Sequence, residues 1–187
     1  MDTARSRTLR VVGNVVAFQL GWFGCVLAAA RGHDAAGVGI VAAIVLLHLW
    51  LAARPSRELC VVVAAVLIGA VWDSLLRKLG LLVYAAPGPA WLAPAWILAM
   101  WALFGTTLNV SLRWLRGRLL VAVLFGGIGG PMAFWAGQRL GAVQIPGPWP
   151  GLLAQAAGWA MILPVLLQLA RRLDTQHDHG PRGDAHV

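Results

Sequence analysis

Polar residues divide the chain into long apolar segments. Five of these, at roughly 11–30, 36–53, 90–112, 119–138 and 151–170, are close to the length of about 20 apolar residues that crosses a bilayer core. A sixth, at 59–76, is interrupted only in its last turn, by Asp73. Backbone groups in hydrocarbon must be hydrogen bonded within their own segment, so we predict that all six are helices. The pattern thus predicts an all-α, polytopic transmembrane bundle of six spans, in one domain over residues 1–172.

Two stretches lie outside these spans. Residues 79–89, "LGLLVYAAPGP", are apolar but too short to cross, and their prolines stop a helix. We expect an interfacial or shallow re-entrant segment here, with Tyr84 at the level of the lipid headgroups. Residues 173–187 are polar and are expected to form a disordered tail, with His177 and His179 solvated and not bound to a metal.

The first span has a second interpretation, as a cleavable signal peptide. A basic start, an apolar stretch and the alanines at 28–30 fit that pattern. The apolar stretch is longer than a usual signal-peptide core, however, and it contains Asn14 and Gln19. We therefore interpret residues 11–30 as a retained span.

Composition favours a membrane protein. Hydrophobic residues make up 59% and charged residues 12% of the chain, against about 45–50% and about 25% in soluble domains. The net charge of +8 does not indicate nucleic-acid binding, because the arginines stand in short groups between apolar runs and form no basic stripe. We expect membrane lipids as partners, together with a membrane protein or a second copy of the chain, and no nucleic acid.

The basic residues also orient the predicted bundle. Cytoplasmic loops of membrane proteins carry an excess of Lys and Arg. With the N-terminus inside, eleven basic residues are cytoplasmic (Arg5, Arg7, Arg10, Arg54, Arg57, Arg113, Arg116, Arg118, Arg171, Arg172 and Arg182) and four are outside (Arg31, Arg77, Lys78 and Arg139). Both termini are therefore predicted to be cytoplasmic. Fourteen arginines against one lysine indicate a GC-rich bacterial genome, which predicts a multi-pass protein of a bacterial inner membrane.

The sequence predicts neither a metal site nor a cofactor. Cys25 and Cys60 both lie inside apolar runs, and a zinc site would need more Cys or His at close spacing. His48 has no second embedded histidine with which to form a bis-histidine site. Hydrogen-bonded packing is the simpler interpretation of His48, with a ligand-binding role as the alternative.

Embedded polar residues are the candidates for a ligand site, since they are costly in a membrane. With a rise of about 1.5 Å per residue, these residues fall into two depth bands. Near the cytoplasmic end lie Asn14, Gln19, His48, Thr106, Thr107, Asn109 and Ser111, which would converge if the first, second and fourth spans are neighbours. Near the outer end lie Asp73, Gln138 and Arg139. Asp73 and His48 differ in depth by roughly 10–12 Å on this rise, so we do not expect them to touch.

Asp73 has two interpretations. Arg77 follows it at i+4, in the order that favours a helical ion pair, which would anchor the third span. Alternatively, the carboxylate faces the bundle beside Gln138 or Arg139 and holds a proton, a cation or a polar headgroup.

The fifth predicted span contains a packing motif. Gly126 and Gly130 form a G-x-x-x-G pair, which lets another helix approach closely, and Pro131 predicts a bend. The segment is not a phosphate-binding loop, because no Lys-Ser/Thr pair follows it.

Four phrases together resemble one family: "GNVVAFQLGWFGCVLAAA" at 13–30, "VWDSLL" at 71–76, "TTLNVSLRWLRGR" at 106–118 and "GGPMAFWAGQRLGA" at 129–142. They are similar to the small bacterial integral membrane proteins catalogued as domain of unknown function 2878. The resemblance covers about residues 10–170. It implies a polytopic inner-membrane protein with no assigned activity and, from the gene neighbourhood of its members, a role linked to lipids. It supplies no catalytic residues.

Three functions remain open at this stage. The scarcity of ionisable groups in the spans favours a non-enzymatic protein that binds a lipid or supports lipid or fatty-acid modification. An integral-membrane enzyme acting on an acyl chain or isoprenoid, through His48 or Asp73, is the alternative. A small transporter is the third candidate, although we find no convincing internal repeat and only the fifth span contains a break.

Overall fold

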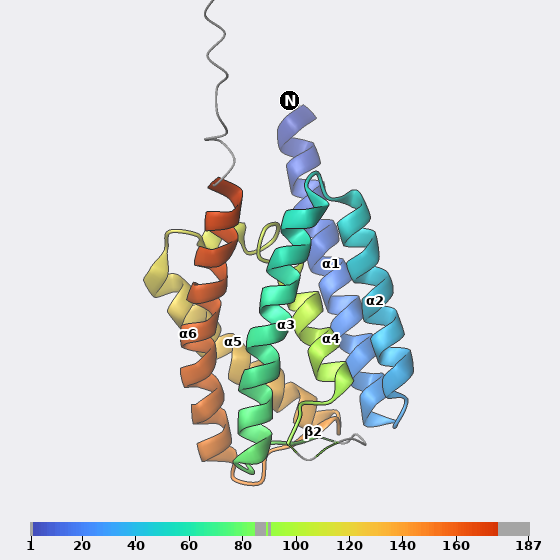
Figure 1. Ribbon diagram of the computed structural model, residues 1–187, viewed down its shortest axis with the longest axis vertical. Coiled ribbons are helices and arrows are strands. Elements are labelled where there is room, and N and C mark those ends of the chain that lie inside the picture. The colour runs from blue at the N-terminus through green and yellow to red at the C-terminus, as the bar shows by residue number, and fades with distance from the viewer. Residues whose placement is uncertain (1, 85–88, 90, 176–187) are drawn as a thin grey trace, which may run out of the picture.

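The computed structural model describes residues 2–84, 89 and 91–175, and these residues are almost entirely helical (Figure 1). Within these described residues, six α-helices, one short 3₁₀ helix and two two-residue strands follow one another. Their order is α1 (Asp2–Ala30), α2 (Asp34–Leu51), α3 (Pro55–Lys78), β1 (Val83–Tyr84), α4 (Ala95–Gly105), η1 (Arg113–Leu115), α5 (Leu119–Arg139), β2 (Val143–Gln144) and α6 (Pro148–Thr175).

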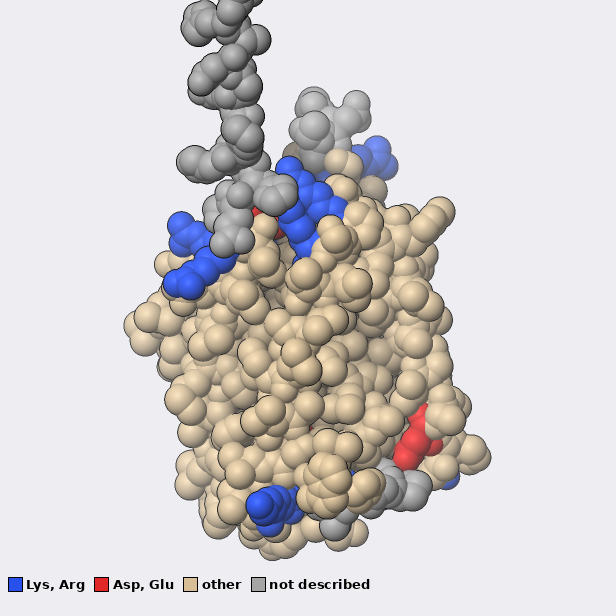
Figure 2. Space-filling view, viewed as in Figure 1, with Lys and Arg blue, Asp and Glu red and all other residues tan. Residues whose placement is uncertain are grey.

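Five of the helices, α1, α2, α3, α5 and α6, are long and apolar enough to cross a membrane. Their outer faces stay apolar: Leu46, Val71 and Leu120, on three different helices, are between 66% and 72% exposed. On the face shown in Figure 2, a broad uncharged belt separates charged residues at the two ends of the molecule. An apolar surface of this extent is typical of a helical bundle embedded in lipid.

The fourth predicted span, 90–112, is only partly helical. Helix α4 has eleven residues, which corresponds to about 16 Å of rise against a hydrocarbon core of about 30 Å. It begins after Pro94 and ends at two threonines whose hydroxyls donate to carbonyls three residues earlier, Thr106 to Leu103 O at 2.7 Å and Thr107 to Phe104 O at 2.6 Å. These side-chain bonds compete with the backbone ladder of a helix, which explains the early end of α4.

The position of α4 allows this irregular continuation. The helix packs against α1, α2 and α3, and the residues after it, 106–112, form successive turns that lead to η1. Leu108 and Thr106 in these turns are fully buried. Non-helical backbone at membrane depth is tolerated where protein surrounds it.

Other boundaries also differ from those predicted. Helix α3 begins at Pro55, so Glu58 lies in its first turn and not before the span. Helix α6 continues to Thr175, three residues into the predicted polar tail at 173–187. The remainder of that tail, with His177 and His179, lies outside the described residues.

The segment at 79–89 contains a short strand that the sequence pattern did not predict. Val83 and Tyr84 form β1 and pair antiparallel with Gln144 and Val143 of β2. Tyr84 is only 4% exposed, so its side chain packs inside the protein. Residues 85–88, which include Pro87, lie outside the described part of the chain.

The two ends of the described chain lie at the same end of the bundle. In Figure 1 the beginning of α1 and the last turn of α6 are both at the top, and the pair β1–β2 closes the opposite end. We call these the arginine end and the strand end. The arginine end carries most of the basic residues that the sequence analysis assigned to the cytoplasm.

Glycines permit the closest helix contacts. A Cβ atom at Gly126 would lie 2.3 Å from Trp159 O, and one at Gly130 would lie 2.3 Å from Trp159 Cγ. The G-x-x-x-G pair of α5 thus holds the indole and backbone of Trp159 in α6, and Pro131 follows inside the helix. Gly69 receives the ring of Trp101 in the same way. These pairs bring α5 against α6 and α3 against α4.

Candidate functional site

A large cavity opens among the helices at the arginine end. Its volume is about 1120 Å³, and it lies between the first turns of α1, the last turns of α2, the start of α3 and the turns after α4. The cavity brings together Asn14, His48, Thr106 and Asn109, which the sequence analysis had placed at one depth. Helices α1, α2 and α4 are neighbours, as that convergence requires.

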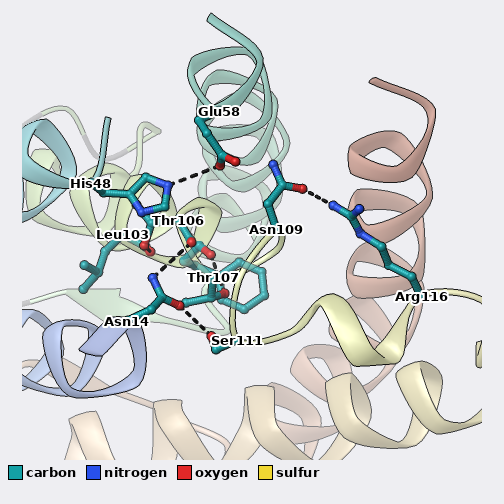
Figure 3. A network of polar contacts seen from close by, with 10 residues as sticks. Asn14, His48, Glu58, Leu103, Thr106, Thr107, Asn109, Ser111 and Arg116 are labelled. Atoms are coloured by element: carbon teal, nitrogen blue, oxygen red, sulfur yellow. Dashed lines mark hydrogen bonds and ion pairs between the residues drawn. The ribbon is translucent and has the colours of Figure 1, made fainter. Parts of the chain in front are cut away.

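Hydrogen bonds fix the polar floor of this cavity (Figure 3). Asn14 Nδ2 donates to Thr106 O at 3.2 Å, while Asn14 Oδ1 accepts from Ser111 Oγ at 2.7 Å. The side-chain amide of Asn14 therefore both donates and accepts a hydrogen bond, and these two bonds connect α1 to the turns that follow α4.

His48 lies at the rim, 3.2 Å from a carboxylate. Its Nε2 atom contacts Glu58 Oε2, and both side chains are mostly buried. This pair connects the end of α2 to the start of α3. Glu58 was not among the predicted site residues, because the predicted third span began one residue after it.

Arg116 contacts two residues that line the cavity, Asn109 and Asp174. Its guanidinium donates to the side chains of Asn109 and Asp174 (Figure 3 shows the first of these). Arg57 donates to the backbone carbonyl of Asp174 at 3.3 Å. The loop after α4, the start of α3 and the end of α6 thus meet at Asp174.

These contacts leave an excess of positive charge at the cavity. Within the described residues, Glu58 contacts His48 and Asp174 forms an ion pair with Arg116, so both carboxylates that line the cavity already have a partner. Four further arginines that line it have no carboxylate partner in that part of the chain: Arg10, Arg54, Arg57 and Arg113.

The remaining walls of the cavity are apolar. They are formed by Leu9 and Ala17 of α1, Ile44 and Leu47 of α2, and Val110 after α4. Leu9 and Leu47 are more than half exposed, so these walls continue onto the lipid-facing surface of the bundle. The cavity therefore has a basic part, formed by its arginines, and an apolar part that is continuous with the lipid-facing surface.

Asp73 lies in a different part of the molecule, close to the strand end. Its side chain is fully buried. Oδ1 accepts a hydrogen bond from Tyr84 Oη at 2.8 Å, and Oδ2 accepts one from Trp101 Nε1 at 2.5 Å. Burial and the neighbouring Asp73 raise the pKa of the Tyr84 phenol well above its usual range, so the hydroxyl keeps its proton.

The anchoring interpretation of Asp73 is wrong. The guanidinium of Arg77 donates to Leu92 O at 2.5 Å, and neither ion pair of the described residues involves Asp73. Asp73 faces the bundle, as the alternative had it, but beside Tyr84 and Trp101. Gln138 and Arg139, the companions suggested by depth, are exposed, and Arg139 lies over the ring of Trp135.

Two other candidates do not line either site. Gln19 is exposed on α1, and the hydroxyl of Thr107 donates a hydrogen bond to the backbone carbonyl of Phe104. Gln155 of α6, which was not a candidate, is fully buried and accepts a hydrogen bond from Trp72 Nε1 at 3.3 Å. It lies inside the predicted span at 151–170, so the rule that selected Asn14 and Gln138 would also have found it. Within the described residues, no cluster of three or more His, Cys, Asp or Glu could hold a metal ion.

Comparison with known proteins gives one match. The model of a family described as "Protein of unknown function (DUF2878)" matches residues 11–165 of the chain. That range includes all six helices at least in part and the surroundings of Asp73, whereas Leu9, Arg10 and Asp174 of the cavity at the arginine end lie outside it. No curated protein and no solved structure matches the chain.

Proposed function

The chain belongs to the DUF2878 family, and we propose that it is a multi-pass protein of the bacterial inner membrane that binds an anionic lipid in the cavity at the arginine end. The observation that carries this proposal is the combination of four arginines without carboxylate partners and an apolar wall in one cavity of about 1120 Å³.

The charge of the cavity selects the headgroup. Basic pockets between helices on the cytoplasmic side of a membrane favour anionic lipid headgroups. Guanidinium groups form charge-assisted hydrogen bonds with phosphate oxygens, frequently in pairs. Arg54 and Arg113 lie on two different segments of the cavity wall and would approach a phosphate from different directions.

The apolar wall suits the rest of a lipid molecule. Because Leu9, Leu47 and Leu51 line the cavity and are also largely exposed, an acyl chain could leave the cavity along α1 and α2 without meeting a polar barrier. A soluble anion would gain nothing from this wall. The arrangement therefore supports a lipid over a free phosphate compound.

The proposed orientation follows from the same residues. Eleven of the fifteen Lys and Arg residues fall on the side of the termini under the predicted topology, and the positive-inside rule places that side in the cytoplasm. The cavity would then open toward the cytoplasmic leaflet, whose anionic lipids attract basic groups.

Lipid binding tests this proposal directly. Protein purified in a mild detergent is mixed with phosphatidylglycerol or with diacylglycerol, a neutral lipid that lacks the phosphate, and bound lipid is measured by native mass spectrometry. We expect selective retention of phosphatidylglycerol. The double variant Arg54→Gln, Arg113→Gln should weaken it by roughly 30-fold, at about 1 kcal/mol for each basic residue near a membrane surface.

A matched control uses basic residues at the strand end. Lys78→Gln with Arg139→Gln removes the same charge from exposed positions distant from the cavity, and it should leave lipid retention unchanged. Equal retention of the two lipids, or equal weakening by both double variants, would contradict the proposal.

A further inference from the structure

The pocket that contains Asp73 is separate from the cavity at the arginine end. It has a volume of about 100 Å³ and lies where α1, α3, α4, α5 and α6 meet. Asp73 is the one ionisable side chain among its described lining residues. The rest of the lining is apolar or aromatic.

Aromatic side chains dominate this lining. Six of them surround the pocket: Phe18 and Trp22 of α1, Trp96 and Trp101 of α4, Phe134 of α5 and Trp159 of α6. Trp101 and Trp159 are stacked, with ring centroids 4.6 Å apart, and Tyr84 meets the ring of Trp96 edge to face. The rings are thus held rigidly by one another.

Two features of the pocket attract positive charge. The carboxyl group of Asp73 is buried without a cationic partner in the described chain, and the groups that hydrogen bond to it, Tyr84, Trp101 and Gln155, are neutral. The faces of aromatic rings carry negative partial charge and attract a cation, most strongly at tryptophan. An anionic ligand would be repelled by the same groups.

From this arrangement we infer that the pocket binds a methylated ammonium group, of the kind carried by choline. A metal ion would need several oxygen ligands, whereas the pocket supplies the oxygens of one carboxyl group. A primary ammonium would need acceptors for three N–H groups. A methylated ammonium needs only the charge and the rings.

The size of the pocket agrees with this ligand. A cavity of about 150 Å³ in another protein holds benzene, which has six heavy atoms. In proportion, about 100 Å³ holds a group of about four heavy atoms, which is the number in a trimethylammonium group. The indole N–H groups of Trp96 and Trp159 have no acceptor in the described chain, and an oxygen atom beside the ammonium, as in a choline ester, would supply one.

The test compares choline with its neutral carbon isostere, in which a carbon atom replaces the nitrogen. Purified protein is placed in nanodiscs of phosphatidylglycerol, and its melting temperature is measured with each compound over a range of concentrations. We expect choline to raise the melting temperature as a ligand of the folded state does, and the isostere to have little effect. Equal shifts from the two compounds would overturn the inference, whether or not any variant folds.

Two variants test whether choline binds at Asp73. Asp73→Asn keeps the shape of the side chain and should weaken choline binding on the order of tenfold or more, since a desolvated cation loses its counter-charge. Asp34→Asn removes a carboxylate at the same end of the molecule, outside the pocket, and should bind choline as the parent does. Choline binding that persists in Asp73→Asn would overturn the inference, as would a site that responds to pH but not to choline.

A second arm distinguishes a free compound from a lipid headgroup. The parent protein is compared in nanodiscs of phosphatidylcholine and of phosphatidylglycerol. If the headgroup is the ligand, phosphatidylcholine stabilises the protein, added choline has less effect, and Asp73→Asn abolishes the difference. If free choline is the ligand, the response to choline is the same in both lipids. Either result supports the ammonium site.

Discussion

The hydroxyl of Tyr84 donates a hydrogen bond of 2.8 Å to Asp73 Oδ1, in the buried interior near the strand end. This contact joins β1 to α3 and depends on the pairing of β1 with β2, which holds Tyr84 under the bundle. A strand of two residues thereby fixes the orientation of a carboxyl group that lies inside an apolar helix.

Removing the hydroxyl should therefore destabilise the fold. Tyr84→Phe keeps the ring, and we expect the free energy of unfolding to fall by about 1.5–3 kcal/mol, the range for a hydrogen bond to a charged group. Unfolding in detergent, followed by circular dichroism, measures this change. In an Asp73→Asn background the same substitution should cost less, about 0.5–1.5 kcal/mol. Identical losses in the two backgrounds would show that the hydroxyl does not act through Asp73.

The G-x-x-x-G pair supplies a second prediction with a control on the same helix. Gly126→Ala would place a Cβ atom 2.3 Å from the backbone oxygen of Trp159, which cannot move away without shifting α6. We expect a loss of about 1–3 kcal/mol from overpacking. Gly129 has no atom within 4 Å of the same position, so Gly129→Ala should be neutral or stabilising. Melting temperatures of the two variants test this, and a Gly126→Ala protein as stable as the parent would refute the packing role.

The contacts of Arg116 predict a weak point at the arginine end. Arg116→Gln breaks the links to Asn109 and Asp174 that hold the turns after α4 against α6. We expect faster amide hydrogen exchange across residues 106–116, together with a lower melting temperature. Arg118 is exposed and lies over the ring of Trp114, so Arg118→Gln should change exchange in this segment much less. Unchanged exchange in Arg116→Gln would contradict the prediction.

The short helix α4 makes topology a separate question. If α4 and the turns after it carry the chain across the bilayer, Lys78 and Arg118 lie on opposite sides. Single cysteines at Lys78 and at Arg118, in a chain without Cys25 and Cys60, should differ in labelling by an impermeant maleimide. We expect the cysteine at 78 to react in intact cells and the one at 118 only after permeabilisation. Reaction of both in intact cells would mean that residues 91–117 do not cross.

The amino-acid sequence by itself determined the five long helices, since an apolar run of this length has few ways to bond its backbone in lipid. It also determined which polar residues share a depth, because the rise of a helix is fixed: Asn14, His48, Thr106 and Asn109 line one cavity as their positions indicated. The spacing of Gly126 and Gly130 likewise indicated a close helix contact, which is found with α6.

Only the tertiary structure decided what each polar residue contacts. Depth along a helix does not fix the face that a side chain occupies, so the sequence left Asp73 either paired with Arg77 or directed inward. Its partners, Tyr84 and Trp101, come from a strand and from a helix 28 residues away. The sequence pattern also did not predict the early end of α4. Hydropathy gives no sign that the hydroxyls of Thr106 and Thr107 donate to backbone carbonyls of the helix. The direction of a buried side chain such as that of Asp73 is settled by the neighbouring elements, and the sequence of one helix does not contain it.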